Sequence, residues 1–241
     1  MNKKEASIAT ITWARNEAEE NLLRASMQQL AALEIPVFIT DGGSKPAFLD
    51  FIRSFPHFSL VFASTKGLWA QAKSSLLAAY HTGAPFIFYT EPDKYDFFCQ
   101  GLPQMLAEIT TDAQSGIILA SRSVIGFTTF PSFQQMTETT INNCCAEVIG
   151  QQLDYTYGPF LLNRQLIPYL EQLQEEIGWG WRPYAFVMAH RLGYGLASFR
   201  GDFSCPPDQR SDNQKERLYR MRQLSQNIEG IVMATQVVIE R

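Results

Sequence analysis

Short apolar segments alternate with helix-forming segments along residues 1–90, and this alternation constrains the fold more than any other feature of the chain. Strands are predicted at residues 8–12, 37–40, 59–63 and 86–89. Helices are predicted from Asn16 to about residue 33, at 47–55 and at 68–80. Strands and helices in this order form βαβ units, which build a parallel sheet through right-handed crossovers. The sequence therefore predicts an α/β fold.

The rest of the chain is less regular. Helices are predicted at residues 102–111, 133–149, 167–177 and 183–192, strands at 116–120 and 195–199, and a loop at 127–131. A long helix is predicted at residues 211–238, with an apolar stripe that we expect to pack on its own domain. The stripe consists of Leu218, Met221, Leu224, Ile228 and Ile231.

Composition excludes several classes of protein. The length of 241 residues and a composition of 46% hydrophobic and 18% charged residues predict one folded domain. Its net charge is −4, and no Lys/Arg cluster with interleaved aromatics appears, so we expect no nucleic-acid partner. No segment has the length of a membrane span or the pattern of a signal peptide. Four cysteines without CxxC spacing predict reduced thiols and a soluble, cytoplasmic protein.

An acidic pair follows the strand predicted at residues 86–89. Pro92 cannot donate a ladder hydrogen bond, so the strand should end there, between Glu91 and Asp93. Open α/β sheets bind ligands at the carboxyl ends of their strands. Two carboxylates at this spacing suit a divalent cation that also holds a phosphate. An acidic turn without a ligand is the alternative, and this stretch alone favours it.

Common catalytic motifs are missing from the sequence. It contains no GxxxxGK[ST], no GxGxxG after the first strand and no GxSxG. The three histidines, His57, His81 and His190, have no metal-pair spacing. We expect His57 and His81 at the surface, whereas His190 has either a packing or a catalytic role.

A set of strand-end motifs resembles the GT-A glycosyltransferases. In chain order they are Trp13-Ala14-Arg15-Asn16-Glu17, Asp41-Gly42-Gly43-Ser44, Lys66-Gly67-Leu68 and Thr90-Glu91-Pro92-Asp93. Further motifs are similar to family-2 enzymes and to the glucosyl-3-phosphoglycerate and mannosylglycerate synthase group. They are Gly158-Pro159-Phe160 with Asn163-Arg164, then Gly178-Trp179-Gly180 and Arg191-Leu192-Gly193.

The resemblance implies a single GT-A-like domain, a three-layer α/β/α sandwich with a mostly parallel central sheet. Residues 1–95 would bind the nucleotide sugar, 96–205 would form the acceptor side, and 206–241 a C-terminal helical extension. The implied activity moves a hexose from a nucleotide-diphosphate sugar, with UDP or GDP as the nucleotide, to a small hydroxyl acceptor, with retention and with Mg²⁺ or Mn²⁺. The C-terminal helix would mediate a homodimer or act as an intramolecular clasp.

The resemblance also assigns residues to the donor. The nucleotide-binding set is Trp13, Arg15, Asn16, Glu17, Asp41, Gly42, Gly43, Lys66 and Lys73. Asp41 would accept a hydrogen bond from the base, and its alternative role is to form the turn before two glycines. Asn16 is explained equally by N-capping, with Glu19 completing a capping box. For Lys66 and Lys73 the alternative is an ordinary solvated lysine.

The implied catalytic residues are Glu91 and Asp93, which would hold the metal, and Arg182, which would meet an anionic acceptor. The alternative for Arg182 is a surface ion pair. The implied acceptor and sugar site consists of Gly158, Trp179, Trp181 and Tyr184. Aromatic residues in a glycine-rich turn are also ordinary packing anchors.

Three departures from the family pattern keep other functions open. Arg182 and Pro183 stand where the group has an acidic residue, and residues 205–210 lack its histidine ligand, for which Asp208 would substitute. Glu91 replaces an aspartate, with Lys94 beside the pair. A degraded GT-A-like domain that binds a nucleotide or sugar without turnover is therefore the alternative. A sugar-phosphate nucleotidyltransferase would need a glycine-rich signature that is absent.

Overall fold

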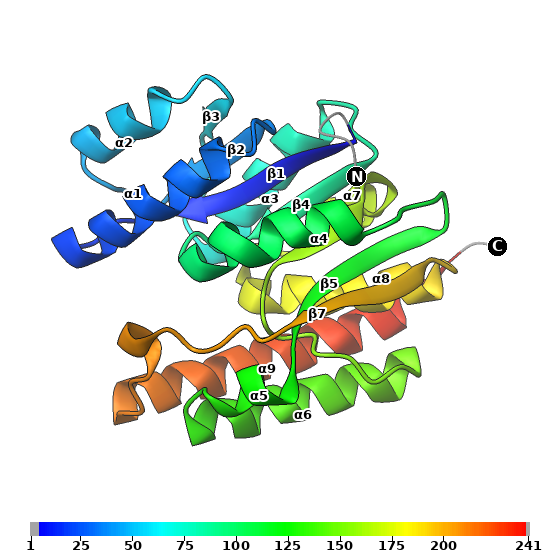
Figure 1. Ribbon diagram of the computed structural model, residues 1–241. Helices are drawn as coiled ribbons and strands as arrows, with labels where there is room; N and C mark the ends of the chain where they lie inside the picture. Colours follow the sequence, from blue (N-terminus) through cyan, green and yellow to red (C-terminus); the bar gives the residue numbers. More distant parts are fainter. Residues whose placement is uncertain (1–4, 240–241) are drawn as a thin grey trace. The chain divides into compact units, whose positions relative to one another are not determined.

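The computed structural model describes residues 5–239, apart from the side chains of Glu175 and Asp208, and divides into two compact units. Unit 1 comprises Met1–Asp112 and Pro159–Glu171, and unit 2 comprises Ala113–Gly158 and Gln172–Arg241. Both contain helices and strands (Figure 1). The predicted α/β fold with a mostly parallel sheet is confirmed, whereas the predicted boundaries at residues 95 and 205 stay predictions.

The strands of unit 1 follow the order β3-β2-β1-β4-β6. Their bounds are Ala6–Thr12 for β1, Val37–Asp41 for β2, Phe58–Val61 for β3, Phe86–Thr90 for β4 and Phe160–Asn163 for β6. The first four are parallel, and β6 is antiparallel to β4. All five residues of β4 are buried, as expected for a central strand. Strand β6 was not among the predicted elements.

The helices of unit 1 cover both faces of this sheet. They include α1 (Glu17–Ala31), α2 (Pro46–Arg53), α3 (Leu68–Tyr80) and α7 (Ile167–Glu171), the last preceded by a 3₁₀ turn at Arg164–Leu166. Right-handed crossovers place α1 and α2 on one face and α3 on the other. Side chains without exposure, among them Met27 and Phe48, fill the core.

The start of α1 differs from the predicted capping box. The Asn16 side chain accepts a hydrogen bond from the Glu19 N–H at 2.9 Å, so the N-cap is confirmed. The Glu19 carboxylate, however, accepts from the Arg15 N–H at 3.0 Å and from the Arg15 guanidinium. The second half of the box is therefore wrong, because the guanidinium of Arg15 draws the carboxylate one residue further back.

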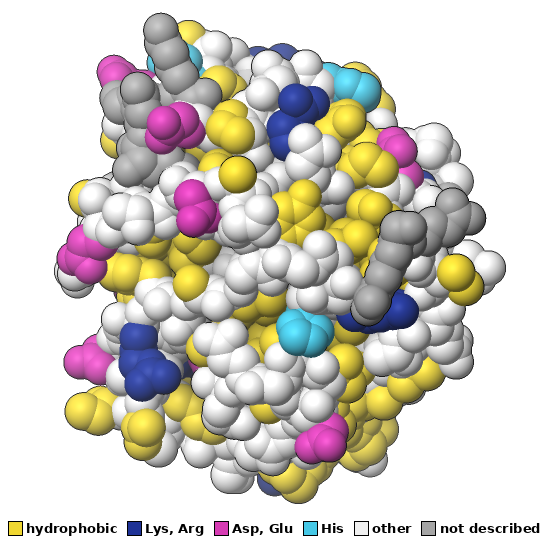
Figure 2. Space-filling view, turned by 90° about the vertical axis from the view of Figure 1, so that its right-hand side faces the viewer, with side chains coloured by type: hydrophobic (Ala, Val, Ile, Leu, Met, Phe, Trp, Pro, Cys, Tyr) yellow, Lys and Arg dark blue, Asp and Glu magenta, His cyan; other side chains and the backbone are white. Residues whose placement is uncertain are grey.

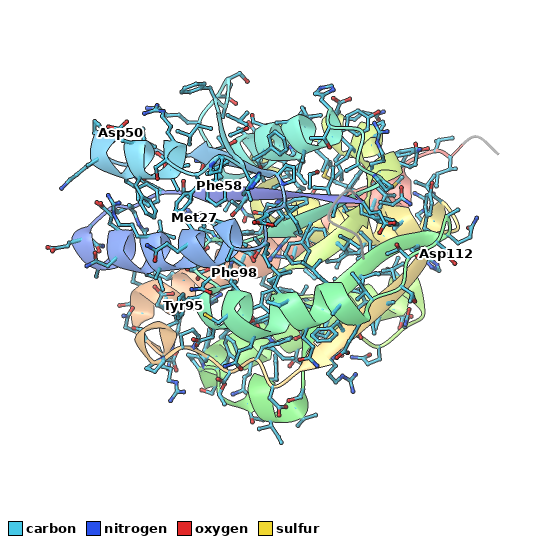
Figure 3. All side chains as sticks on the ribbon, turned by 45° about the horizontal axis from the view of Figure 1, so that its top comes forward. Met27, Asp50, Phe58, Tyr95, Phe98 and Asp112 are labelled. Atoms are coloured by element: carbon cyan, nitrogen blue, oxygen red, sulfur yellow. The ribbon has the colours of Figure 1, made fainter. Side chains whose placement is uncertain are left out.

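The helix after β4 starts earlier than predicted. Helical residues begin at Tyr95, form a π-helical turn at Phe97–Gly101 and continue as α4 (Leu102–Glu108). Pro103 has no N–H to donate to the carbonyl of Cys99, and the Leu102 N–H donates to the Phe97 carbonyl instead. Figure 3 labels Tyr95 and Phe98 in this first part of the helix, which contacts α1.

Unit 2 contains two parallel strands and several helices. The elements are β5 (Ser115–Arg122), β7 (Gly195–Gly201), α5 (Val124–Thr128), α6 (Ser132–Ile149), α8 (Trp181–Arg191) and α9 (Gln214–Gln236), with 3₁₀ turns at Glu175–Gly180 and Pro207–Gln209. The predicted loop at 127–131 is partly helical, because Ser123 caps α5 by accepting from the Gly126 N–H. The predicted helix at 167–177 ends at Glu171. Helix α8 begins before Pro183, which lies in its first turn, where a missing N–H is tolerated.

Helix α9 packs within unit 2 mainly through its C-terminal half. Its buried residues are Asn227, Gly230, Ile231 and Ala234. Of the predicted stripe only Ile231 is buried, whereas Leu218 and Met221 are 58% and 47% exposed. A Cβ added to Gly230 would lie 2.0 Å from the carbonyl oxygen of Gly180. The predicted packing of α9 on its own domain is confirmed for the later part of the stripe, where Leu224 and Ile228 are partly buried and Ile231 is buried, and wrong for the exposed Leu218 and Met221.

Candidate functional site

Unit 1 has three polar loops, which follow the carboxyl ends of β1, β2 and β4. The strand register pairs Thr12 with Asp41 and Thr10 with Thr90, so these loops start beside one another. In Figure 1, β1 runs away from the N label toward this edge. The strand order reverses between β1 and β4, and open α/β sheets bind ligands at such a switch point.

The carboxylate of Asp41 holds the β2 loop together. Its Oδ1 accepts from the N–H groups of Gly43 and Ser44 at 2.8 and 2.6 Å. Its Oδ2 accepts from the hydroxyls of Thr12 and Ser44 at 2.8 and 2.6 Å. An ionised carboxylate offers about four acceptor sites, so these bonds use them all. The geometry favours the turn-forming role, and a base contact by Asp41, which stays a prediction, would have to displace one of the four.

Trp13 presents an aromatic face at this edge. The side chain is 52% exposed, and a Cβ on Gly42 would lie 3.1 Å from its Cβ and Cγ atoms. Gly43 has φ 123°, a conformation that side chains rarely adopt. The Arg15 guanidinium lies 5.6 Å from the centre of the Trp13 ring. The double glycine therefore lets the indole lie against the β2 loop, with a flat surface open to a planar ligand.

The other residues predicted on the β1 loop have structural roles or are simply exposed. Arg15 forms an ion pair with Glu19 at 2.7 Å, and Arg15 hydrogen bonding lowers the pKa of that carboxyl. Asn16 is the N-cap of α1. Glu17 is exposed in the first turn, where its charge complements the helix dipole.

The two predicted diphosphate lysines differ in their surroundings. Lys73 donates to the carbonyl oxygen of Glu171 at 2.6 Å, which ties α3 to the last residue of α7. Lys66 is exposed and precedes Gly67, whose φ is 135°. A Cβ on Gly67 would meet nothing within 4 Å, so the backbone at the start of α3 is open. Lys66 is therefore the one of these two lysines positioned to meet a ligand.

The acidic pair lies directly after β4. The Thr10 hydroxyl donates to the Thr90 carbonyl at 2.8 Å and fixes the strand end. Glu91 is 8% exposed, and the side chain of Asp93 is 37% exposed. Lys94 Nζ lies 3.9 Å from Asp93 Oδ1, so Lys94 and Asp93 form an ion pair at the limit of contact.

The donor set of this pair fits a hard divalent cation. Among the described side chains, no group of three or more His, Cys, Asp and Glu residues is arranged to hold a metal ion. Mg²⁺ and Mn²⁺ need only one or two carboxylates when water and substrate phosphates complete their coordination. Glu91 and Asp93 suit that arrangement. The side chain of Asp208, the predicted third ligand, lies outside the described residues.

The predicted acceptor residues belong to unit 2. Arg182 is 7% exposed, with its guanidinium 4.7 Å from the Trp179 ring centre, so it is buried rather than at the surface. Trp181 and Tyr184 are 0% and 3% exposed, and burial raises the pKa of Tyr184. Trp179 keeps a partly exposed ring, whose Nε1 donates to the Tyr219 hydroxyl at 3.0 Å. A sugar platform therefore keeps only Trp179 of these aromatic residues.

A buried charge cluster that the sequence did not reveal supports the segment around Gly158. The Arg122 side chain is 1% exposed and pairs with Glu138 at 2.8 Å and with Asp154 at 2.7 Å. It also donates to the Thr156 hydroxyl at 2.9 Å. The one available signal in the sequence was an arginine at the end of an apolar strand. That position does not indicate which residues pair with Arg122.

Aromatic rings enclose this cluster. Phe127, Phe130 and Tyr157 have ring centres 4.7, 4.5 and 5.6 Å from the guanidinium of Arg122. Gly158 follows Tyr157 with φ 125° and is buried. The cluster and its rings thus fix the backbone that leads to Gly158, the predicted acceptor-side glycine.

The three histidines all lie at the surface. His57, His81 and His190 are exposed, so the two surface predictions are confirmed and a packing role for His190 is wrong. On the face in Figure 2, the coloured Lys and Arg side chains are scattered, and one group lies beside Asp and Glu side chains. Among the described residues, no helix is long and apolar enough to cross a membrane.

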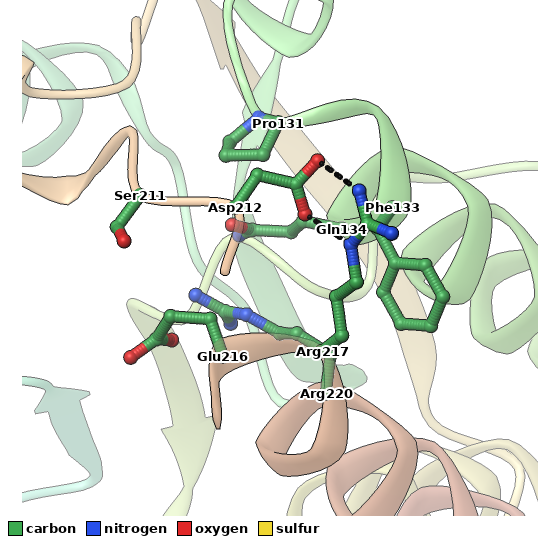
Figure 4. A pocket seen from close by; sticks show the side chains of 8 residues that line it. All are labelled: Pro131, Phe133, Gln134, Ser211, Asp212, Glu216, Arg217 and Arg220. Atoms are coloured by element: carbon green, nitrogen blue, oxygen red, sulfur yellow. Dashed lines mark hydrogen bonds and ion pairs between the residues drawn. The ribbon is translucent and has the colours of Figure 1, made fainter. Parts of the chain in front are cut away.

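Unit 2 has a hollow between α6 and the start of α9 (Figure 4). Its rim is already paired, since Arg217 donates to Asp212 at 2.9 and 3.1 Å and Arg220 to Gln223 at 2.9 Å. The bonds from Arg217 lower the pKa of Asp212. The hollow is a gap between surface ion pairs, and the strand-end loops of unit 1 remain the candidate site.

Comparisons with known proteins support the fold. No protein-family model and no curated protein matches the sequence. A glucosyl-3-phosphoglycerate synthase from Mycobacterium tuberculosis, solved with Mn²⁺, UDP-glucose and phosphoglyceric acid, is similar in structure with TM-score 0.65 and 14% identity, covering 97% of this chain and 81% of that one. A mannosyltransferase from Pyrobaculum calidifontis, solved with GDP-mannose and Mn²⁺, has TM-score 0.60 and 13% identity, covering 98% and 66%. The chain therefore has the GT-A-like fold that its motifs predict, shared with these enzymes.

Proposed function

We propose that the chain is a glycosyltransferase that moves a hexose from a nucleotide-diphosphate sugar to a small hydroxyl acceptor. The observation that carries the proposal is the meeting of three polar loops at the β1–β4 switch point, with Glu91 and Asp93 on one and Trp13 on another. Similar structures hold UDP-glucose or GDP-mannose together with Mn²⁺. Retention at the anomeric carbon is part of the proposal, as the resemblance implies.

Each residue has a defined task in this proposal. Trp13 stacks on the base, and Lys66 offsets charge on the diphosphate. Glu91 and Asp93 hold Mg²⁺ or Mn²⁺. The bound cation supplies charge neutralisation at the departing nucleoside diphosphate. On the acceptor side, Gly158 and Trp179 line the sugar, and Arg182 meets a carboxylate or phosphate on the acceptor.

The test is turnover with defined donors. The full chain is incubated with UDP-glucose, UDP-galactose or GDP-mannose, Mn²⁺ and phosphoglyceric acid as a candidate acceptor. Release of UDP or GDP and the mass of the product are then measured. We expect Asp93→Asn to lower kcat/KM about 10²- to 10³-fold, because it removes charge that stabilises the leaving diphosphate. Asp50→Asn, at an exposed aspartate of α2, is the matched control and should leave turnover unchanged.

The second candidate is a binding domain without turnover, and the position of Lys94 favours it. Its ammonium 3.9 Å from Asp93 Oδ1 competes with a metal ion for the same carboxylate. Lys94→Ala is expected to strengthen Mn²⁺ binding several-fold, as measured by calorimetry with UDP present. Binding of UDP or GDP without release from any donor would support the binding domain, whereas absence of nucleotide binding would contradict both functions.

A further inference from the structure

The outward face of α9 is exposed along its whole length. Its residues recur every three or four positions, opposite the buried face of Asn227, Gly230, Ile231 and Ala234. The exposed members are Gln214, Leu218, Met221, Arg222, Ser225, Glu229, Val232 and Gln236. Scattered apolar residues on a surface are ordinary, so exposure alone carries no argument. The argument rests on the order of the residues along this face.

On this outward face, similar or oppositely charged residues lie at nearly equal distances before and after Ser225. Leu218 and Val232 lie seven residues before and after Ser225, and they are 58% and 43% exposed. Gln214 and Gln236 lie eleven residues before and after it. Arg222 precedes Ser225 by three residues and Glu229 follows it by four. A surface with this symmetry is complementary to itself under a two-fold rotation.

We propose that a second copy of this chain binds this face, with the two α9 helices antiparallel and crossing at Ser225. Leu218 then lies against Val232 of the second copy, and Arg222 lies beside its Glu229. Two-fold symmetry forms each contact twice. The small Ser225 at the centre allows close approach of the helices, and the spacing of three and four residues is that of a coiled-coil seam.

The charges select this orientation. A parallel pair of α9 helices would bring Arg222 against Arg222 and Glu229 against Glu229, which repel. The antiparallel pair brings opposite charges together instead. Helix α9 has 23 residues, so the seam is about 35 Å long and lies at the small end of stable interfaces. The dimer is therefore reversible and depends on protein concentration. It does not depend on the proposed activity.

A charge swap tests the pairing. Sedimentation equilibrium of the full chain between roughly 1 and 100 μM, the range suited to a small interface, gives the dimer dissociation constant. Arg222→Glu and Glu229→Arg are each expected to weaken the dimer at least about tenfold, because each creates two like-charge contacts. The double variant R222E/E229R restores the pairs and should return to within about threefold of wild type. Arg200→Glu, at an exposed position of β7, is the control and should change nothing.

A cross-link tests the crossing point independently. Ser225→Cys places one thiol opposite its own copy at the two-fold axis, where oxidation should give a chain pair on a non-reducing gel. Wild type under the same oxidation controls for Cys99 and Cys144, which are partly exposed. The proposal is overturned if the wild-type chain stays monomeric or if both charge reversals leave the dimer dissociation constant unchanged. It is equally overturned if the double variant does not recover dimerisation, or if the Ser225→Cys variant dimerises but fails to cross-link.

Discussion

Replacing Arg122 with leucine is expected to lower the free energy of unfolding by about 3–5 kcal/mol. The arginine is buried between Glu138 and Asp154, and its removal leaves two carboxylates in the interior without their counter-charge. Burial opposes the charge of Arg122, yet the two carboxylates outweigh it and raise its pKa further. Urea denaturation followed by circular dichroism measures the loss.

The matched control is Arg53→Leu. Arg53 pairs with Asp50 at 2.8 Å, but both side chains are more than half exposed, so the change should stay below about 1 kcal/mol. The variant R122L/E138Q/D154N removes all three charges and is expected to recover part of the stability lost by Arg122→Leu. An Arg122→Leu protein as stable as Arg53→Leu would contradict the ionic account of this cluster.

The same cluster makes stability depend on acid. Burial alone would raise the pKa of Asp154, but the charge of Arg122 and its hydrogen bonds outweigh this and lower the pKa to about 2 from 3.8. A group with a lowered pKa stabilises the fold above its unfolded pKa, and this contribution is lost as pH falls. We therefore expect wild type to lose about 2 kcal/mol between about pH 4 and pH 2. Asp154→Asn should lack this part of the pH dependence in denaturation curves recorded at each pH.

The Arg122 cluster is important for the proposed acceptor side because it holds the irregular backbone before Gly158 in place. Residues 150–159 contain no helix or strand, yet Tyr155, Thr156 and Tyr157 are buried. Irregular backbone in an interior needs side-chain partners for its polar groups. Asn142 accepts from the Tyr155 N–H at 2.9 Å, and Asp154 accepts from the Thr156 N–H at 3.2 Å. The backbone before Gly158 thus depends on buried polar side chains from α6 and β5.

Local signals in the sequence predicted the first half of the fold well. The Asn16 cap depends on a residue three positions away, and the helix at Leu68–Tyr80 lies at its predicted bounds. The strand ends were also recognisable, because Pro92 and the Gly42–Gly43 pair disfavour the continuation of a central strand. These features locate the three loops of the candidate site without any knowledge of tertiary contacts.

Features that depend on distant partners were not predictable in this way. Strand β6 pairs with β4 across more than seventy residues, and its four apolar residues carry no alternation that marks a strand. The saturated carboxylate of Asp41 depends on Thr12, which lies on another strand. Arg122 finds its partners on α6 and in the segment after it. Such contacts are set by the packed structure and leave little periodic trace in the chain.

Gly230→Ala on α9 is the second change with a large expected effect. In an exposed helix this substitution stabilises by up to about 1 kcal/mol, since glycine is a poor helix former. Here the added Cβ would lie 2.0 Å from the carbonyl oxygen of Gly180, and backbone cannot turn aside as a side chain can. We therefore expect a loss of about 3 kcal/mol from overpacking, measured by thermal and urea denaturation. Ser225→Ala, on the opposite face, should change stability by less than about 0.5 kcal/mol.

Gly230→Ala should also affect the proposed function, because Gly180 lies between Trp179 and Arg182. Trp179 precedes it and Arg182 lies after it in the first turn of α8. Trp179 is also tied to α9 by the bond from its N–H to the Gln226 side chain at 3.2 Å. A displaced α9 shifts these two residues together, whereas the loops that hold Trp13, Glu91 and Asp93 belong to unit 1. Gly230→Ala should therefore raise the KM for the acceptor more than the KM for the nucleotide sugar. Equal changes in both, or a variant as stable as Ser225→Ala, would show that close contact between Gly180 and Gly230 does not organise the acceptor side.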